Sequence, residues 1–360
     1  MYELNNKLKK LDAYDPITGS YEIRLDANES PYNLPDYIMK DIADRICALS
    51  FNRYPDPLAT DTVNAFAKYY NLDSDNVTGG NGSDEIISII ESCFFEKGDR
   101  ILSFSNDFSM YRFYAELYEL ENVVYQKNDD LSVDVDKVIE ICNTQNIKAV
   151  IFSNPCNPTS LGIEKNEVLR LIENVNCLVI ADEAYMDFWN QSILDKVNDY
   201  DNLIILKTCS KAVGLAGIRL GFAVANKTIT NALRSAKSPY NTDSISQLVG
   251  AALFEEEKWL KKACADIIGN TEKLYDEICR ICSAFPNILA MPQKPCTNFV
   301  FIKSDYCDEV FKSLQNKSIA IRNFKTYVRI CCGTKSENQC LLTALEEICE
   351  ELSNNLVYGG

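Results

Sequence analysis

The chain has 360 residues, of which 46% are hydrophobic and 24% are charged, so it is long enough for one large or two medium globular domains. Its 36 basic and 52 acidic side chains give a net charge of −16, which argues against nucleic acid or an anionic membrane as the main partner. The sequence contains no histidine, which excludes Ser-His-Asp triads, histidine general bases and imidazole metal ligands.

The cysteines and the N-terminus indicate the compartment. Fifteen cysteines are spread along the chain, and residues 1–7 lack the apolar segment of a signal peptide. Apolar runs stay well short of the ~18 residues of a membrane span. We therefore expect a cytoplasmic protein with reduced thiols. The lone C-x-x-C of Cys279 and Cys282 is interpreted as part of a helix, because no second pair has the spacing of a zinc site.

Helices and strands alternate along the first two thirds of the chain. The pattern predicts a helix over 60–70, a glycine turn at 79–82 and a helix over 83–95. Short apolar strands are predicted at 101–104, 123–125, 149–152, 177–181, 203–206 and 220–225, with helical patterns between several of them, such as 164–174. Apolar strands separated by helices predict an α/β fold with a mostly parallel central sheet flanked by helices.

The pattern changes after about residues 239–241. A long helical stretch over 246–285 leads into strands near 299–302 and 328–331, which predicts a smaller α+β domain. We expect an N-terminal arm over 1–25, a small domain made of 26–50 and 245–360, and a large domain over 51–244.

The loops after the strands are the places to look for a site, because ligands of open parallel sheets bind at the carboxyl ends of the strands. The glycine loop 79–82 runs into a helix that begins near Ser83, so its N–H groups could bind a phosphate. An ordinary helix start with a serine cap explains the same residues. The loop has neither the G-x-G-x-x-G nor the Walker spacing, so it gives no support to a nucleotide site.

Two charged residues follow later strands. Asp182 ends the apolar strand 177–181, where a carboxylate is costly unless a cation lies opposite; a helix cap or surface carboxylate is the alternative. Lys211 lies between hydroxyl-bearing and small residues, with Arg219 eight positions on. A lysine in such an apolar setting can lose its proton and become a nucleophile, although an isolated lysine would simply be a solvated surface residue.

Taken together, the motifs resemble those of fold type I pyridoxal-phosphate enzymes, specifically the histidinol-phosphate aminotransferase group. The matching stretches occur in the order of that family and span nearly the whole chain: Leu25–Pro31, Arg53–Pro55, Gly82–Glu85, Asn154–Thr159, Asp182–Tyr185, Ser210-Lys211 with Arg219, and Arg329 before Gly333-Thr334. The resemblance implies pyridoxal 5'-phosphate as cofactor, bound by the large domain.

The resemblance assigns the central chemistry to three positions. Lys211 would bind the cofactor covalently and later move the proton between it and the substrate Cα. Asp182 would face the pyridine nitrogen; a charge pair about 4 Å apart at an effective dielectric of ~20 interacts by about 4 kcal/mol, or roughly three pKa units, which keeps the ring protonated. Tyr185, with Asn157, would hydrogen-bond the phenolic oxygen of the ring.

The remaining cofactor contacts are also implied by the resemblance. Phe108 would stack on the ring, at a position where the family usually has tyrosine. The phosphate would bind the N–H groups of Ser83 and Asp84, the hydroxyls of Thr208 and Ser210, and Arg219. Tyr54 would come from a neighbouring subunit, which implies a homodimer with a shared site.

For the substrate, the resemblance implies that Arg329 binds the α-carboxylate of the amino donor, glutamate. Arg322 and Tyr14 match positions that bind the distal phosphate of histidinol phosphate, and Asn28 and Glu29 match the substrate mouth. Two departures from the family pattern bear on the substrate rather than on the chemistry. Ser160 stands where a glycine is usual, with Gly162 slightly later, and the stretch between the two arginines is short.

The resulting prediction is transamination between histidinol phosphate and 2-oxoglutarate, in histidine biosynthesis. An aromatic amino-acid aminotransferase and a decarboxylase of the threonine-phosphate type remain open on the same fold. A non-catalytic cofactor-binding regulator is an alternative of a different class, but the sequence offers no basic helix-turn-helix segment for it. An α/β protein without a cofactor would require all the motif matches to be coincidental.

Overall fold

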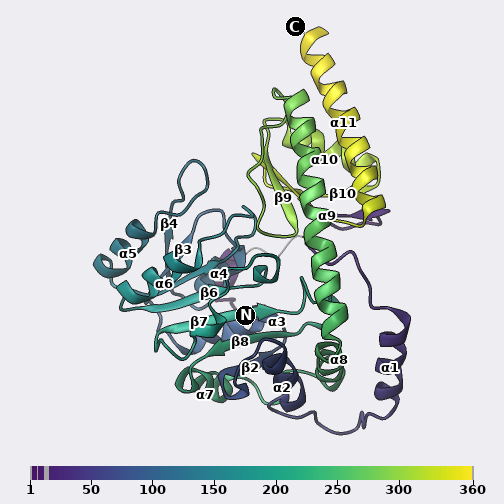
Figure 1. Cartoon of the computed structure of the whole chain (residues 1–360). Helices are drawn as coiled ribbons and strands as arrows, with labels where there is room; N and C mark the ends of the chain where they lie inside the picture. The colour runs from purple at the N-terminus through teal and green to yellow at the C-terminus, as the bar shows by residue number, and fades with distance from the viewer. Residues whose placement is uncertain (1, 6, 12–15, 359–360) are drawn as a thin grey trace.

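The computed structural model describes residues 2–5, 7–11 and 16–358. Its largest sheet has seven strands in the order β2-β8-β7-β6-β5-β3-β4 (Figure 1). Neighbouring strands from β7 to β4 are parallel, while β8 runs antiparallel to both β7 and β2. The strands are β2 (Val77–Gly80), β3 (Arg100–Phe104), β4 (Glu121–Tyr125), β5 (Ile147–Ser153), β6 (Leu178–Asp182), β7 (Leu203–Thr208) and β8 (Gly221–Ala225). The predicted mostly parallel sheet is confirmed.

Helices cover both faces of this sheet. Alternate strand residues bury into two separate apolar clusters. On β6, for example, Val179 belongs to the cluster that includes side chains of α2, α5, α6 and α8, and Ile180 belongs to the one that includes side chains of α3, α4 and α7. Burial on both faces explains why the strands are continuously apolar in sequence. The helices are α2 (Thr60–Tyr69), α3 (Gly82–Cys93), α4 (Ser109–Leu117), α5 (Val135–Thr144), α6 (Lys165–Asn174), α7 (Lys227–Ala236) and α8 (Ser244–Glu255).

A smaller α+β part packs around a third apolar cluster and rises above the large sheet in Figure 1. Strands β11, β12 and β9 form an antiparallel sheet, and the N-terminal β1 pairs in parallel with β10. The elements are β1 (Ile23–Arg24), α9 (Glu257–Ala284), β9 (Phe299–Lys303), α10 (Cys307–Asn316), β10 (Ile319–Ala320), β11 (Arg322–Asn323), β12 (Tyr327–Cys331) and α11 (Lys335–Tyr358). Short 3-10 helices lie at Leu8–Lys10, Ser74–Asn76, Met186–Phe188, Leu194–Lys196 and Ala216–Ile218.

The packing of α1 (Asp36–Cys47), α8 and α9 indicates where the large and small parts of the chain meet. Residues 246–285, expected as one helical stretch, form two helices, because α8 ends before Glu256 and α9 begins after it. Both α8 and α1 bury side chains in the core of the large sheet, although the sequence placed them in the small domain. Within α9, Leu260 belongs to the large core and Ile267 to the small one. We therefore propose a boundary inside α9.

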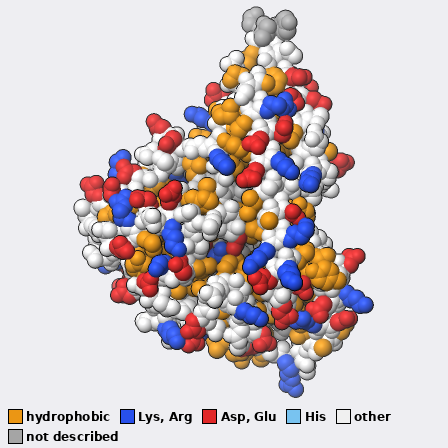
Figure 2. All heavy atoms as spheres, in the orientation of Figure 1, with side chains coloured by type: hydrophobic (Ala, Val, Ile, Leu, Met, Phe, Trp, Pro, Cys, Tyr) orange, Lys and Arg blue, Asp and Glu red, His pale blue; other side chains and the backbone are white. Residues whose placement is uncertain are grey.

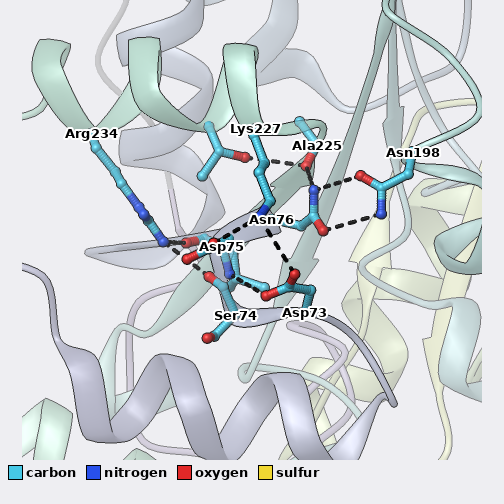
Figure 3. A network of polar contacts seen from close by, with 10 residues as sticks. Asp73, Ser74, Asp75, Asn76, Asn198, Ala225, Lys227 and Arg234 are labelled. Carbon is cyan, nitrogen blue, oxygen red and sulfur yellow. Dashed lines mark hydrogen bonds and ion pairs between the residues drawn. The ribbon is translucent and has the colours of Figure 1, made fainter.

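A polar network anchors the edge strand β2 (Figure 3). Asn76 donates to the carbonyl of Ala225 at 2.7 Å and exchanges hydrogen bonds with Asn198. Arg234 Nη2 donates to the carbonyls of Ser74 and Val77, both at 2.9 Å. These contacts join the start of β2 to the end of β8 and to α7. The glycine turn expected at 79–82 is not a loop, because Gly79 and Gly80 pair with β8 as part of β2 and α3 already begins at Gly82.

The surface is mixed in charge. Acidic and basic side chains are interspersed over the face drawn in Figure 2, with hydrophobic side chains between them. Within the described ranges, the structure contains no helix that is both long and apolar enough to cross a bilayer. All fifteen cysteines lie among the described residues and are free thiols.

Candidate active site

A cavity of about 460 Å³ lies between the carboxyl ends of β5, β6 and β7 and the small part. It brings together most of the residues that the sequence singled out. Those lining it are Asn28, Glu29, Ser83, Asp84, Phe108, Asn157, Asp182, Tyr185, Thr208, Ser210, Lys211, Arg219, Arg322 and Arg329. Tyr54 does not line it, and Tyr14 falls outside the described residues.

Asp182 is the last residue of β6 and is only 3% exposed. Its Oδ2 accepts a hydrogen bond from the Tyr111 hydroxyl at 2.9 Å, and its Oδ1 accepts one from the Ala184 N–H at 3.0 Å. Burial raises the pKa of the Asp182 carboxyl to about 7, because these two donors offset only part of the lost hydration. A cationic group in the cavity would lower this pKa and favour the ionised carboxylate.

Lys211 and Tyr185 meet the N-terminal segment that crosses the cavity. Lys211 Nζ donates to the carbonyl of Ala27 at 2.9 Å and lies 5.8 Å from the centre of the Tyr185 ring. The buried Asn28 adopts a positive φ of 54° and donates from Nδ2 to the Tyr185 hydroxyl at 3.0 Å. Because that hydroxyl oxygen already accepts a hydrogen bond, its own proton is available to another acceptor.

A cradle of polar groups lies at the N-terminus of α3. Arg219 donates to Ser210 Oγ at 3.4 Å and pairs with Asp84 at 3.3 Å, and Thr208 Oγ1 donates to Ser210 Oγ at 3.1 Å. Glycine is required behind this cradle, because a Cβ on Gly221 would lie 2.4 Å from the backbone nitrogen of Ser83. Hydroxyls, a helix N-terminus and a guanidinium group form a set of donors that fits a phosphate.

Asn157 and Arg329 connect the large and small parts. Asn157 follows β5, and its Oδ1 accepts a hydrogen bond from Arg329 Nη1. Arg329, on β12, also donates from Nη2 to the carbonyl of Asp26 at 2.5 Å. Arg322 is opposite Arg329 in the register of β11 and β12, so the two arginines lie on the same face and line the same cavity.

Phe108 immediately precedes α4 and packs edge-on against Tyr111, with 5.6 Å between the ring centres. Asp107 accepts from the Phe108 N–H at 2.7 Å and from the Ser153 hydroxyl. Sequence reasoning missed Tyr111, Asp107 and Ser153. For Tyr111 a signal existed, because it follows Phe108 by three positions, the spacing that places residues on the same face of a helix.

Tyr54 lies elsewhere on the surface. It is 81% exposed and stacks on Tyr240, with 4.5 Å between the ring centres and 15° between the ring planes. It borders a separate hollow of about 840 Å³ between α1, α2 and α8. In this chain, therefore, Tyr54 lies on the exposed surface and apart from the cavity.

Comparison with known proteins gives one consistent result. The family described as aminotransferase class I and II matches residues 21–345. The chain is 37% identical over 346 residues to the histidinol-phosphate aminotransferase of Clostridium kluyveri, which covers 95% of this chain and 97% of the relative.

Solved structures agree in fold. The histidinol-phosphate aminotransferase of Sinorhizobium meliloti, in complex with pyridoxal-5'-phosphate, superposes with a TM-score of 0.87 at 21% identity, covering 98% of this chain and 99% of that one. The enzyme of the same name from Clostridium acetobutylicum gives 0.82 at 23% identity, covering 91% and 99%.

Proposed function

The chain belongs to the class I and II aminotransferases and is a pyridoxal-phosphate-dependent transferase, and from this premise we propose that it transfers the amino group between histidinol phosphate and 2-oxoglutarate, as part of histidine biosynthesis. The observation that carries the proposal is the identity to a relative of that activity along almost the entire length of both chains. The cavity supports it with basic side chains suited to an anionic substrate.

The groups in the cavity fit the cofactor. The cradle beside Ser83 fits its phosphate, and the buried Asp182 fits its ring nitrogen, because a cation opposite that carboxyl relieves the burial that raises its pKa. When bound, pyridoxal phosphate supplies an aldehyde carbon that accepts the amino group and a cationic ring that withdraws electrons from the substrate Cα. Phe108 would pack on the ring, and Tyr54 would reach the phosphate from a second subunit.

The protein's own groups would then carry the proton and hold the substrate. The Lys211 amine would take the proton from the Cα of the amino donor in the first half-reaction. It would give a proton to the Cα of the acceptor in the second. The Tyr185 hydroxyl, held by Asn28, would donate to the phenolic oxygen beside Asn157. Arg329 would bind the α-carboxylate through two parallel hydrogen bonds.

The distal end of the substrate would lie toward the small part. Arg322 would bind the phosphate of histidinol phosphate, as would Tyr14, which lies outside the described residues. Glu29 and Asn28 line the cavity on the N-terminal segment, where the mouth of the site is proposed.

A half-reaction panel tests this function. Glutamate, histidinol phosphate, phenylalanine and threonine phosphate would be added separately to the cofactor-loaded protein, and the change in cofactor absorbance would be followed. We expect glutamate and histidinol phosphate to convert the cofactor to its amine form. Conversion by phenylalanine but not histidinol phosphate would instead identify an aromatic aminotransferase, and carbon dioxide release from threonine phosphate would identify a decarboxylase.

We also propose that the chain acts as a cytoplasmic homodimer. Exposed aromatic and aliphatic side chains lie close in sequence to Tyr54 and its partner Tyr240; they are Tyr37, Met39, Phe51, Leu58 and Ile245. Side chains of this kind mark a protein–protein interface where they form one continuous surface. A second copy bound here would bring Tyr54 to a neighbouring cavity.

Subunit mixing tests the shared site. Lys211→Ala and Tyr54→Ala, each with low activity alone, would be mixed under conditions that exchange subunits. In a mixed dimer one site is doubly defective and the other is complete, so random mixing should recover about a quarter of the wild-type activity. Activity that remains at the sum of the two separate variants would show that Tyr54 serves its own subunit or none.

A further inference from the structure

A third arginine lines the substrate end of the cavity and has no role in the function proposed above. Arg24 is the last residue of β1, which pairs with β10 in the small part. It lines the same cavity as Arg322 and Arg329. The carboxylates lining this end are Asp26 and Glu29, so three cations face two anions in a chain whose net charge is −16.

Arg24 is held in place by a buried carboxylate. Its Nε and Nη2 donate to the two oxygens of Asp26 at 3.3 and 2.9 Å, and Nη2 also donates to the carbonyl of Ile17 at 3.0 Å. Asp26 is 6% exposed, whereas the Arg24 side chain is 41% exposed. Among residues 2–5, 7–11 and 16–358, Nη1 has no hydrogen-bond partner, so the guanidinium group keeps donors for a ligand.

Asp26 also ties Arg24 to the residue proposed to bind the α-carboxylate. The Asp26 carbonyl accepts from Arg329 Nη2 at 2.5 Å, while the Asp26 side chain binds Arg24. One residue therefore sets the spacing between the two guanidinium groups. Two guanidinium groups held at a fixed spacing can bind the two carboxylates of glutamate, and they can also converge on the single phosphate of histidinol phosphate.

We propose that Arg24 is a specificity-determining residue that binds the distal anionic group of the substrate, and that it favours a phosphate monoester over an uncharged end. This rests on the proposed function. Nε and Nη2 of Arg24 are engaged by Asp26 and Ile17, so Nη1 supplies the N–H donors for phosphate oxygens. A dianion also gains more from the additional cation than a monoanionic carboxylate does. The expected preference is therefore phosphate over the γ-carboxylate of glutamate, and both over a hydroxyl.

The test compares Arg24→Gln with the wild-type protein, both saturated with cofactor. We expect kcat/KM to fall about tenfold for histidinol phosphate, less than about threefold for glutamate, and to stay unchanged for unphosphorylated histidinol. Arg24→Lys keeps the charge but loses the paired contact with Asp26. Its kcat/KM for histidinol phosphate should lie between those of the wild type and Arg24→Gln. Arg280→Gln is the matched control, because Arg280 pairs with Glu277 and Glu346 outside the cavity and its loss removes the same charge.

A second measurement separates this proposal from the proposed function. Inorganic phosphate should inhibit the glutamate half-reaction of the wild-type protein competitively, and its inhibition constant should rise about tenfold in Arg24→Gln. If histidinol phosphate is not a substrate at all, the proposed function is wrong and the phosphate measurement still decides the role of Arg24. Equal losses for all three substrates, or unchanged inhibition by phosphate, would show that Arg24 has only a structural role.

Discussion

Two neighbouring carboxyl groups at the end of β6 point in different directions, one into the cavity and one away from it, and burial raises the pKa of both. Asp182 faces the cavity and accepts hydrogen bonds only from neutral donors. Glu183, the next residue, is buried away from the cavity, where it accepts from the Ser192 hydroxyl at 2.6 Å and the Ile193 N–H at 2.9 Å. Near it a complete ion pair is formed, with Lys207 Nζ 2.8 Å from Asp187.

The difference separates positions that stabilise the fold from positions suited to a ligand. Beneath β7 the Asp187 carboxylate is fully matched, because the Tyr70 hydroxyl donates to its second oxygen at 2.8 Å. On the cavity side, burial leaves Asp182 with a pKa of about 7, so its charge is not matched by the protein alone. Replacements on the two sides should therefore affect different measurements.

The largest effect is expected from Lys211→Ala. It removes the proposed covalent and proton-carrying group, so transamination should fall by at least about a thousandfold while the thermal midpoint stays near that of the wild type. The rate is read from the half-reaction with glutamate, and the visible absorbance shows whether the cofactor is still held covalently. A variant that transaminates as well as the parent would disprove the assignment of this lysine.

Asp182→Asn tests the unmatched carboxyl. Losing about 4 kcal/mol of attraction to a cationic ring should lower kcat about a thousandfold. Without cofactor, the same replacement should instead stabilise the protein. The raised pKa means that the stability of the wild type is greatest at low pH and falls as the pH rises through about 7, whereas asparagine does not titrate.

The apoprotein of Asp182→Asn should thus be more stable than the wild-type apoprotein at pH 8, by up to about 4 kcal/mol, and similar to it at pH 4. Urea unfolding at several pH values measures this. A stability difference that stays constant with pH would mean that the carboxyl is charged throughout.

Lys207→Met tests the matched side. It leaves the half-buried Asp187 carboxylate without its cation, so the free energy of unfolding should fall by up to about 3 kcal/mol. The double variant Lys207→Met with Asp187→Leu should recover part of this loss. We expect kcat of the folded protein to change less than about threefold. A much larger fall in kcat would place Lys207 with the cavity residues.

The smallest effect is expected from Asn76→Ala in the network of Figure 3. It removes the hydrogen bonds to Ala225 and Asn198 at the start of β2, which should lower the free energy of unfolding by about 1–2 kcal/mol. Cofactor affinity should stay nearly constant, because the packing of Gly221 against Ser83 holds the cradle independently. A marked loss of affinity in a titration would show that the edge strand also positions the phosphate loop.

The sequence alone predicts the features that depend on local residue patterns. The apolar strands, the helices between them and the placement of Asp182 and Lys211 after strands could be identified from the chain alone. Contacts set by tertiary packing could not. The spacing of Tyr111 from Phe108 does not show that its hydroxyl meets Asp182, and nothing near Arg24 in sequence indicates that it lines the cavity. The helical pattern over 246–285 does not show which core its apolar side belongs to.

The division of α9 between two cores has a thermodynamic consequence. The helix has 28 residues and buries Leu260 with the large sheet but Ile278 and Ile281 with the small part. Because α9 is hydrogen-bonded along its whole length, unfolding the part of the helix that lies in one core frays the part that lies in the other. Although the large and small parts have separate cores, heating should therefore give one cooperative calorimetric transition rather than two.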